Sequence, residues 1–349
     1  MIKKSISALL LALLSLTAYA ADKEGEGLTY YLPKTAVNVS LLVEKTTYTP
    51  GQMAAYAELY FKTPAKTTAD TDYRIVGISF STEGVPDSTK RYTILLDKKH
   101  SIFDIDCESN GVLKAINTKG VTKAAPAKFV AARKPAPLNP NDYMNQDILS
   151  AGNLPKMAQM VAQEIYDIRD SRNQLSRGEA DFMPNDGEQL RMMLAQLRTQ
   201  ETALMQMFTG VTVKDTTECV FQFVPDPKVQ KRTLFRFSKK FGCVADDDLS
   251  GDPYYVYVDD EHVYPDLPDE AEAAKKQKDD LVLGVNLPGK IRVRLSAGSQ
   301  TQASFETYAA QYGQVEPLSG ALFGKKMTAR LVLDTVTGAV VTLKTEPIE

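Results

Sequence analysis

The chain has no tryptophan, only two histidines and only three cysteines among its 349 residues. Neither His100 nor His262 belongs to an HExxH or HxH arrangement, so a zinc site would need ligands from distant segments. No cysteine has a CxxC neighbour, which argues against thiol-redox catalysis. The lack of tryptophan also disfavours a carbohydrate-active enzyme, because sugar subsites commonly stack on wide aromatic side chains. These absences leave few groups from which a catalytic site could be built.

Other catalytic motifs are also missing or incomplete. The stretch GISFS lacks the closing glycine of a nucleophile elbow. In SGALFGKKM, three residues rather than four separate the two glycines of a phosphate-binding loop, and a lysine replaces the expected hydroxyl. Asp104 and Asp106 alternate on an expected strand, and a carboxylate pair is what a glycoside hydrolase needs. Two acids on a solvent face are the commoner meaning, so we expect no catalytic residue and keep a carboxylate-dependent glycan hydrolase as the alternative.

The most apolar run of the sequence lies at its very start. Residues 1–20 combine a basic MIKK segment, a short apolar core and the small-x-small pattern AYA, which a signal peptidase recognises. The apolar core is too short to span a bilayer, and no later segment is apolar enough to do so. We therefore expect a signal peptide over residues 1–20 and an exported mature chain without a transmembrane segment. A periplasm is the simplest destination, and the cell surface is the alternative.

The charge balance argues against one class of partner. The formal net charge is −3, and removal of the leader takes away Lys3 and Lys4 but no acid. A general binder of nucleic acid or of anionic membranes needs a basic surplus, which this chain lacks. We expect no nucleic-acid partner.

The first part of the mature chain has the pattern of strands joined by turns. TAVNVSLLVEKTTY alternates apolar and polar residues, and MAAYAELYFK, YRIVGISFSTEG, KRYTILLD and GVLKAINT are expected to continue as strands. TPGQ and EGVPDST are expected to be the turns between them. The following segment from Thr118 to Asp142 is rich in Ala, Pro and basic residues, with no acid before its last position, and has the composition of a linker. Its positive charge could alternatively meet an acidic partner or the anionic peptidoglycan.

The hydrophobic period then changes to that of helices. Met157, Val161, Ile165, Ile168 and Leu175 share one helical face, and Gly178 is the expected helix end. A second stripe predicts a second helix that begins at an Asp186–Gln189 capping signal and ends at Gly210; its members are Leu190, Leu194, Leu197, Leu204 and Phe208. The two helices predict an αα-hairpin that packs on itself and on a sheet. Because methionine-rich stripes suit adaptable surfaces, a partner-binding or dimerising face is the alternative.

Strands return after the hairpin, interrupted by the acidic-then-basic run PDLPDEAEAAKKQKDD, which is expected to be a surface loop or short helix. The predicted fold is α+β and mainly β, with two antiparallel β-rich lobes, sandwich- or barrel-like, and an inserted αα-hairpin. The expected boundaries are 1–20 for the signal peptide, 21–117 for an N-terminal β domain, 118–153 for the linker, 154–210 for the hairpin and 211–349 for a C-terminal β domain.

The stretch CVADDDLSGDPYYVYVDDEH begins like a calcium loop. Counted from Asp246, the residues Asp248, Ser250 and Gly251 match positions 3, 5 and 6 of an EF-hand. Position 12 is Tyr257, which cannot supply the bidentate carboxylate, and the exit reads as a strand rather than a helix. An EF-hand is therefore excluded. Asp246, Asp248 and Ser250 remain candidates for a looser calcium site, while a polar turn is the simpler interpretation. No other cofactor is expected.

Two residue pairs are candidates for a disulfide bond and for an anion contact. Cys219 and Cys243 lie in one β-rich region, so they are the more plausible disulfide pair in an oxidising compartment, although three buried thiols would also fit. Arg169 and Arg172 are three residues apart on one helix face and could grip a carboxylate or phosphate. More often such arginines pair with acids of their own chain.

Three long stretches of the sequence resemble an uncharacterised family of exported envelope proteins of Gram-negative bacteria. They are LTYYLPKTAVNVSLLVEKTTYTPGQMAAYAELYF, IRDSRNQLSRGEADFMPNDGEQLRMMLAQLRTQETALMQMFTG and DDLSGDPYYV. The resemblance implies the compartment and the order of β segment, helical hairpin and β segment. We expect a non-enzymatic protein that binds or scaffolds an envelope protein or a glycan. A calcium-stabilised glycan-binding protein is a further alternative, and the sequence does not indicate the oligomeric state.

Overall fold

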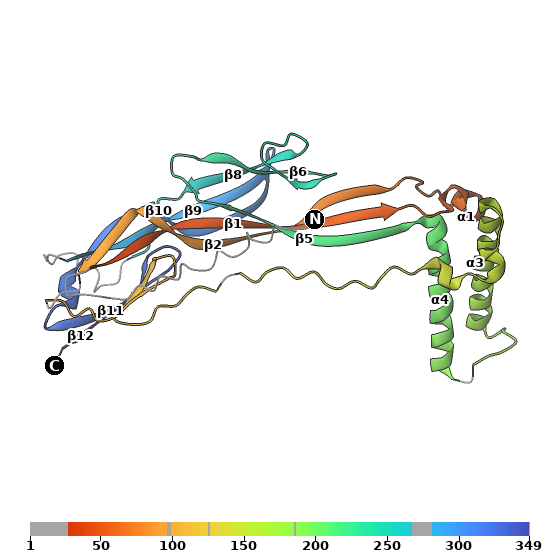
Figure 1. Ribbon diagram of the computed structural model, residues 1–349, viewed down its shortest axis with the longest axis horizontal. Helices are drawn as coiled ribbons and strands as arrows, with labels where there is room; N and C mark the ends of the chain where they lie inside the picture. The colour runs from red at the N-terminus through yellow and green to blue at the C-terminus, as the bar shows by residue number, and fades with distance from the viewer. Residues whose placement is uncertain (1–26, 96–98, 125, 185, 267–280, 349) are drawn as a thin grey trace, which may run out of the picture.

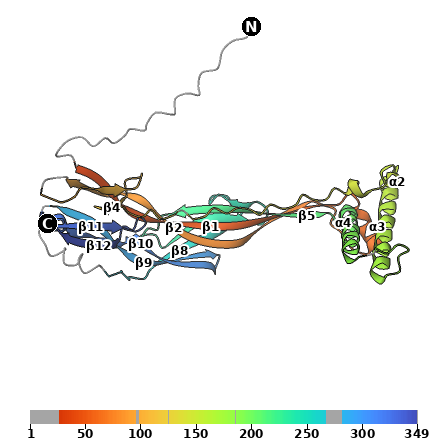
Figure 2. The same cartoon turned by 90° about the horizontal axis from the view of Figure 1, so that it is seen from below.

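The molecule is long and narrow, with three parts arranged along one axis (Figures 1 and 2). A β-rich body lies at one end, a three-stranded stalk extends from it, and a helical head lies at the other end. The computed structural model describes residues 27–95, 99–124, 126–184, 186–266 and 281–348. The expected signal peptide and most of the expected acidic-then-basic loop lie outside these described residues.

The described strands form three antiparallel sheets. The first has the order β2-β1-β5, made of β1 (Gly27–Thr49), β2 (Asp70–Leu95) and β5 (Val211–Phe223). The second has the order β10-β9-β8-β6-β7, made of β6 (Lys231–Ser238), β7 (Gly242–Val244), β8 (Asp252–Asp260), β9 (Val282–Ala297) and β10 (Gln300–Ser319). The third has the order β12-β11-β4-β3, made of β3 (Ile105–Cys107), β4 (Leu113–Ile116), β11 (Met327–Leu333) and β12 (Val340–Pro347).

The sheets pack on one another around two apolar clusters. Strand β1 contributes to both clusters, since it is long enough to pass from one to the other. Its buried side chains largely alternate along the strand, as a period of two requires. Tyr30 and Leu32 belong to the first β core, together with residues of β4, β9 and β11. Val37 and Leu41 belong to the second β core, together with residues of β5, β6, β8 and β9. The second core therefore lies between the first and the second sheet, as in a sandwich.

The mainly β fold with an inserted helical hairpin is confirmed, but the boundaries of the two β domains need a correction. Strand β1 pairs along its second half with β5, from Val37 opposite Phe223 to Thr49 opposite Val211. Strand β4 likewise pairs with β11. Residues 21–117 and 211–349 therefore share sheets and both β cores. Sequence patterns locate strands but do not say which distant strand completes each hydrogen-bond ladder, and here the partner lies across the hairpin.

Three segments of the β region differ from the expectation. Met53–Lys62, predicted as a strand, is helical: η1 (Ala54–Tyr56) leads into α1 (Ala57–Phe61). EGVPDST is no turn but part of the continuous strand β2, where the register shifts between Tyr31 and Pro33. Strand β10 was not predicted, because its inward residues include small and polar side chains that weaken the alternating pattern.

The helical head contains the predicted hairpin and several shorter pieces. The hairpin consists of α3 (Leu154–Arg177) and α4 (Gly187–Thr209). Gly178 ends α3 with a positive φ of 75°, and the side chain of Asp186 accepts a hydrogen bond from the N–H of Gln189 at the start of α4. The predicted helix ends are therefore confirmed, including Gly210 after α4. Local signals sufficed because each cap acts on backbone groups within one turn.

The hairpin packs on short helices, not on a sheet as expected. One apolar cluster, the head core, joins the base of the hairpin to η1 and α1 on one side and to η2 (Pro140–Tyr143) and α2 (Gln146–Leu149) on the other. Phe208 is fully buried there and stacks edge-on against Phe61. Met144 and Ile148 are also buried in this core. The last part of the expected linker, residues 140–153, is therefore part of the head.

Of the rest of the expected linker, residues 118–124 and 126–139 form an extended strap that lies along the stalk between the body and the head (Figure 1). The backbone N–H of Phe129 donates to a Glu218 carboxylate oxygen at 3.1 Å, and Lys134 lies 3.8 Å from Asp215. Both acids are on β5. The strap is thus held to acidic residues of the stalk by one backbone hydrogen bond and one ion pair.

In the described part of the chain, no helix combines the length and the apolar character that a bilayer-spanning helix requires.

Candidate functional site

The two aspartates of the candidate hydrolase pair are held by separate lysines. Asp104 lies 3.2 Å from Lys119, and Asp106 on β3 lies 3.2 Å from Lys114. Burial acts to raise the pKa of Asp106, but the hydrogen bond from the N–H of Gly120 and the charge of Lys114 outweigh it, so this pKa lies below its ordinary value. A general acid of a glycosidase needs a raised pKa instead. The pair is suited to structural ion pairing rather than to acid catalysis.

The acidic loop before β8 is closed by an arginine. Arg236 donates from Nε to the carbonyl oxygen of Asp246 at 2.7 Å and from Nη1 to that of Gly251 at 3.0 Å. The Asp248 carboxylate accepts a hydrogen bond from the N–H of Ser250 at 2.9 Å, which forms a local turn. Among the residues that the structure describes, no group of three His, Cys, Asp or Glu side chains is arranged to hold a metal ion. Asp246, Asp248 and Ser250 therefore form a turn that delivers β8, and they are not gathered as a ligand set.

The two arginines predicted to grip an anion do so within the hairpin. Arg169 Nε lies 2.6 Å from Glu201 Oε1, and Arg172 binds the other oxygen of the same carboxylate. Glu201 lies on α4, in the seam that faces α3, between the leucines of the free end and the head core. The guanidinium group of Arg169 also lies over the face of the Phe61 ring, with its carbon 5.4 Å from the ring centre. This contact helps to hold Arg169 in place. The anion site is therefore occupied by a residue of the protein itself.

Removing this carboxylate should weaken the hairpin measurably. Glu201→Gln leaves two half-buried guanidinium groups without their counter-charge, and we expect a loss of about 2 kcal/mol in the free energy of unfolding. Glu188→Gln is the matched control on the same helix, because its ion pair with Arg191 is exposed and should contribute less than about 0.5 kcal/mol. Urea unfolding followed by the helical circular-dichroism signal measures both. Equal effects of the two substitutions would contradict the assigned role of Glu201.

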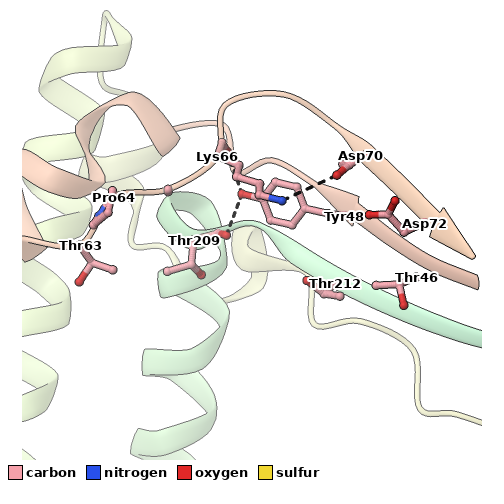
Figure 3. A pocket seen from close by; sticks show the side chains of 10 residues that line it. Thr46, Tyr48, Thr63, Pro64, Lys66, Asp70, Asp72, Thr209 and Thr212 are labelled. Carbon is pink, nitrogen blue, oxygen red and sulfur yellow. Dashed lines mark hydrogen bonds and ion pairs between the residues drawn. The ribbon is translucent and has the colours of Figure 1, made fainter. Parts of the chain in front are cut away.

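A shallow pocket of about 400 Å³ lies where the stalk meets the head (Figure 3). The residues that line it come from the stalk strands, the segment after α1 and the end of α4: Thr46, Tyr48, Thr63, Pro64, Ala65, Lys66, Asp70, Asp72, Thr209 and Thr212. The Tyr48 hydroxyl lies 2.8 Å from the carbonyl oxygen of Lys66 and 3.0 Å from that of Thr209, and it can donate to either. Tyr48 thus fastens the end of α4 to the stalk.

The acids of this pocket are also engaged by lysines. Lys240, from the turn between β6 and β7, lies 2.7 Å from Asp70 and 2.8 Å from Asp72, and Lys66 lies 3.7 Å from Asp70. The hydrogen bond from Lys240 lowers the pKa of Asp70 below its ordinary value. An ionised, ion-paired carboxylate cannot serve as a general acid at neutral pH. The pocket therefore has the features of a structural joint between body, stalk and head.

One face of α4 carries no charge and is only partly covered. Gln189, Met192, Met193, Gln196 and Gln200 follow one another at helical spacing and form what we call the uncharged face. The same face continues toward the stalk as Ala203 and Met207, which are buried. There, the N–H of Met53 donates to the carbonyl oxygen of Met207 at 2.7 Å, so the segment before α1 covers this end.

Toward the free end of the hairpin the uncharged face lies open. Met192 is 64 % exposed and Met193 is 37 % exposed. In the loop between the helices, Phe182 is 74 % exposed. The charged residues Arg191 and Arg198 lie on another side of α4, as their spacing requires. Exposed apolar side chains gathered at one end of a helical pair are typical of a contact surface.

A second surface with aromatic residues lies on the second sheet. Tyr255 and Tyr257 alternate with the buried Val256 and therefore point to the outer face of β8. Lys231 lies over both rings, with its Nζ 4.1 Å from the centre of Tyr255 and 5.3 Å from that of Tyr257. Arg294 also lies over the Tyr257 ring. Cations thus occupy the positions in which a sugar ring would stack.

The cysteine pair predicted from the sequence is brought together. Cys219 on β5 and Cys243 on β7 both pack against the second β core, and burial together with the neighbouring Cys219 raises the pKa of Cys243. All three cysteines are thiols in this structure and are half-buried. Cys107 packs against the first β core instead.

The chain belongs to an uncharacterised protein family, described as a domain of unknown function (DUF4831), whose family model matches residues 26–341. The match covers the body, the stalk and the head. No curated protein and no solved structure matches the chain significantly.

Proposed function

We propose that this protein is a non-enzymatic binding or scaffolding protein of the cell envelope, and that the uncharged face of α4 is its contact surface for another envelope protein. The leader-like residues 1–20 and the resemblance to exported envelope proteins support the compartment. The lysine-paired state of Asp70 and Asp106 supports the non-enzymatic role, because neither acid has the raised pKa of a catalytic acid.

The observation that carries the proposal is the continuity of the uncharged face. Where it approaches the stalk, the residues around Met53 cover it and bury Ala203 and Met207. Toward the free end, Gln196, Met193 and Met192 continue the same surface without a cover. A helix laid along this open part would extend the layer that η1 and α1 begin. The open part of the uncharged face could therefore pack against a helix in the way that the part near the stalk packs against η1 and α1.

The chemistry of the surface indicates the kind of partner. Methionine side chains are flexible and polarisable, so they adapt to different apolar side chains, while the glutamines offer neutral hydrogen-bonding groups. An apolar, helical partner segment fits such a surface in the helix-in-groove mode, with anchors at i, i+3 and i+7. We therefore commit to an amphipathic helix of another envelope protein as the occupant.

The stalk gives this contact surface its position. Three paired strands carry the head away from the body, and the strap runs alongside them (Figure 1). Tyr48 and Lys240 brace the stalk at the end that meets the head. Tyr48 reaches the carbonyl oxygen of Thr209 at the end of α4, and Lys240 pairs with Asp70 and Asp72. The body would then be free to make a second contact, which is what a scaffold requires.

Charge placed on the uncharged face should abolish the contact. We expect the double substitution Met192→Glu with Met193→Glu to remove a partner that cross-linked full-length protein recovers from its own envelope. The reason is that a carboxylate cannot be buried against an apolar helix without a counter-charge. Ala195→Glu is the matched control, because Ala195 is exposed on another side of α4. Recovery is measured by quantitative mass spectrometry of the cross-linked material.

The outcomes separate the possible occupants. One reproducible envelope protein that is lost with the double substitution and retained with Ala195→Glu supports the proposal. A second copy of the chain, a glycan, or equal recovery with all variants would overturn it. Unchanged helical circular dichroism of each variant excludes misfolding as the cause of a loss.

A further inference from the structure

The structure places two thiols against each other between two sheets. Cys219 belongs to β5 in the first sheet, where it is opposite Leu41 of β1. Cys243 belongs to β7 in the second sheet, where it is opposite Phe237 of β6. Both side chains pack against the same second β core, and Cys219 lies close enough to Cys243 to add to burial in raising the pKa of that thiol. Two half-buried thiols that face each other across a sandwich are positioned as the halves of one covalent link.

We propose that Cys219 and Cys243 form a disulfide bond that fastens the second sheet to the first sheet beside the base of the stalk. The proposal rests on the export proposed above only for its oxidising surroundings, since disulfides persist where thiols are not continually reduced. It concerns a site on the body and is independent of the uncharged face of α4.

The reaction needs a disulfide donor, which a thiol–disulfide oxidoreductase or a small-molecule disulfide supplies. One cysteine thiolate attacks the donor disulfide to form a mixed disulfide, and the second cysteine then displaces the donor. The protein thiols lose two electrons and two protons, and the donor leaves as two thiols. Burial raises the pKa of Cys243, as does the neighbouring Cys219, so little thiolate is present once the sheets are packed. The bond therefore forms while the sheets are closing.

Cys107 provides an internal control for this assignment. It lies on β3 and packs against the first β core, together with residues such as Leu113 and Ile116. Burial raises the pKa of its thiol, and no cysteine of the described chain is placed beside it as a partner. It should remain a thiol when the other two are oxidised.

The test is a thiol count on the full-length protein, secreted through its own leader and purified without reductant. Denatured protein should react with one equivalent of a thiol reagent per chain, and with three after reduction. The oxidised chain should be about 2 Da lighter than the reduced chain. Peptide mapping should link the peptide containing Cys219 to the one containing Cys243. Reduction should lower the midpoint of thermal unfolding of the body by about 5 °C.

Two variants keep the test decisive. Cys107→Ala should leave no reactive thiol before reduction, and Cys219→Ala should leave two. Three reactive thiols in the purified wild-type protein that persist after incubation with oxidised glutathione would overturn the proposal, as would a link to Cys107. Neither result would bear on partner recovery through α4, so a failure here is distinguishable from a failure of the proposed function.

Discussion

Gly210→Ala should destabilise the head by about 4 kcal/mol, because this glycine adopts a backbone conformation that an L-residue cannot take without strain. Its φ is 75° and its ψ is −176°, a combination essentially restricted to glycine. An added Cβ would also lie 2.5 Å from the carbonyl oxygen of Thr49 and 2.8 Å from the Tyr48 ring. Strain and overpacking therefore act at the same residue, where α4 returns to the stalk.

Two other glycines of the hairpin serve as graded controls. Gly178 has a positive φ but no atom near the position of its Cβ, so Gly178→Ala should cost about 1 kcal/mol. Gly187 has neither restriction, and Gly187→Ala at the start of α4 should be neutral or slightly stabilising. Hydrogen exchange of amides in α3 and α4 measures the three free energies. Similar values for Gly210→Ala and Gly178→Ala would show that the junction is not closely packed.

Asn286→Ala should destabilise the body by about 3 kcal/mol, because it removes the hydrogen-bond partner of three groups at once. Asn286 is fully buried, and its amide nitrogen donates to the carbonyl oxygens of Pro33 and Thr337 at 3.1 and 2.8 Å. Its amide oxygen accepts a hydrogen bond from Lys90 at 3.3 Å. The side chain thus joins β9 to β1, to β2 and to the turn between β11 and β12. In Asn286→Ala the carbonyl oxygens of Pro33 and Thr337 would lose these hydrogen bonds while they stay buried, so the cost of removing them from water would no longer be offset.

Asn38→Ala is the control for this prediction. Asn38 also lies on β1, but it makes one exposed hydrogen bond of 3.4 Å to Glu83, so its loss should cost less than about 0.5 kcal/mol. Chemical unfolding followed by tyrosine fluorescence, which reports on the tyrosine-rich body, measures both variants. A body that tolerates Asn286→Ala as well as Asn38→Ala would refute the assigned role.

The features that the sequence predicted correctly depend on interactions between near neighbours. The hairpin was predicted because Asp186 and Gly178 act on backbone groups within one turn and the leucine stripe of α4 has a helical period. Periodicity misled at Met53–Lys62, where an alternating pattern of small and aromatic residues suggested a strand, although the segment is helical. Its alanines favour a helix, and Met53 and Ala57 are buried against α4 rather than in a sheet.

The features that the sequence did not predict depend on contacts across long separations. No local pattern says that β1, which pairs with β2 along its length, also pairs with β5 from Val37 to Thr49 to form a three-stranded stalk. The role of Glu201 was equally hidden, because it follows from the meeting of two helix faces. The methionines of α4 gave a local signal of an adaptable surface, but only the structure shows which of them remain exposed.

We propose that the head, held away from the body, contacts another envelope protein through the uncharged face of α4. Site-specific photo-cross-linking tests this most directly, with a photoreactive amino acid replacing Met192 or, on another side of the same helix, Ala195 of the full-length protein in its own cells. We predict one discrete cross-linked product with another envelope protein from position 192, and none from position 195. Products of equal yield from both positions, or a product from neither, would contradict the claim.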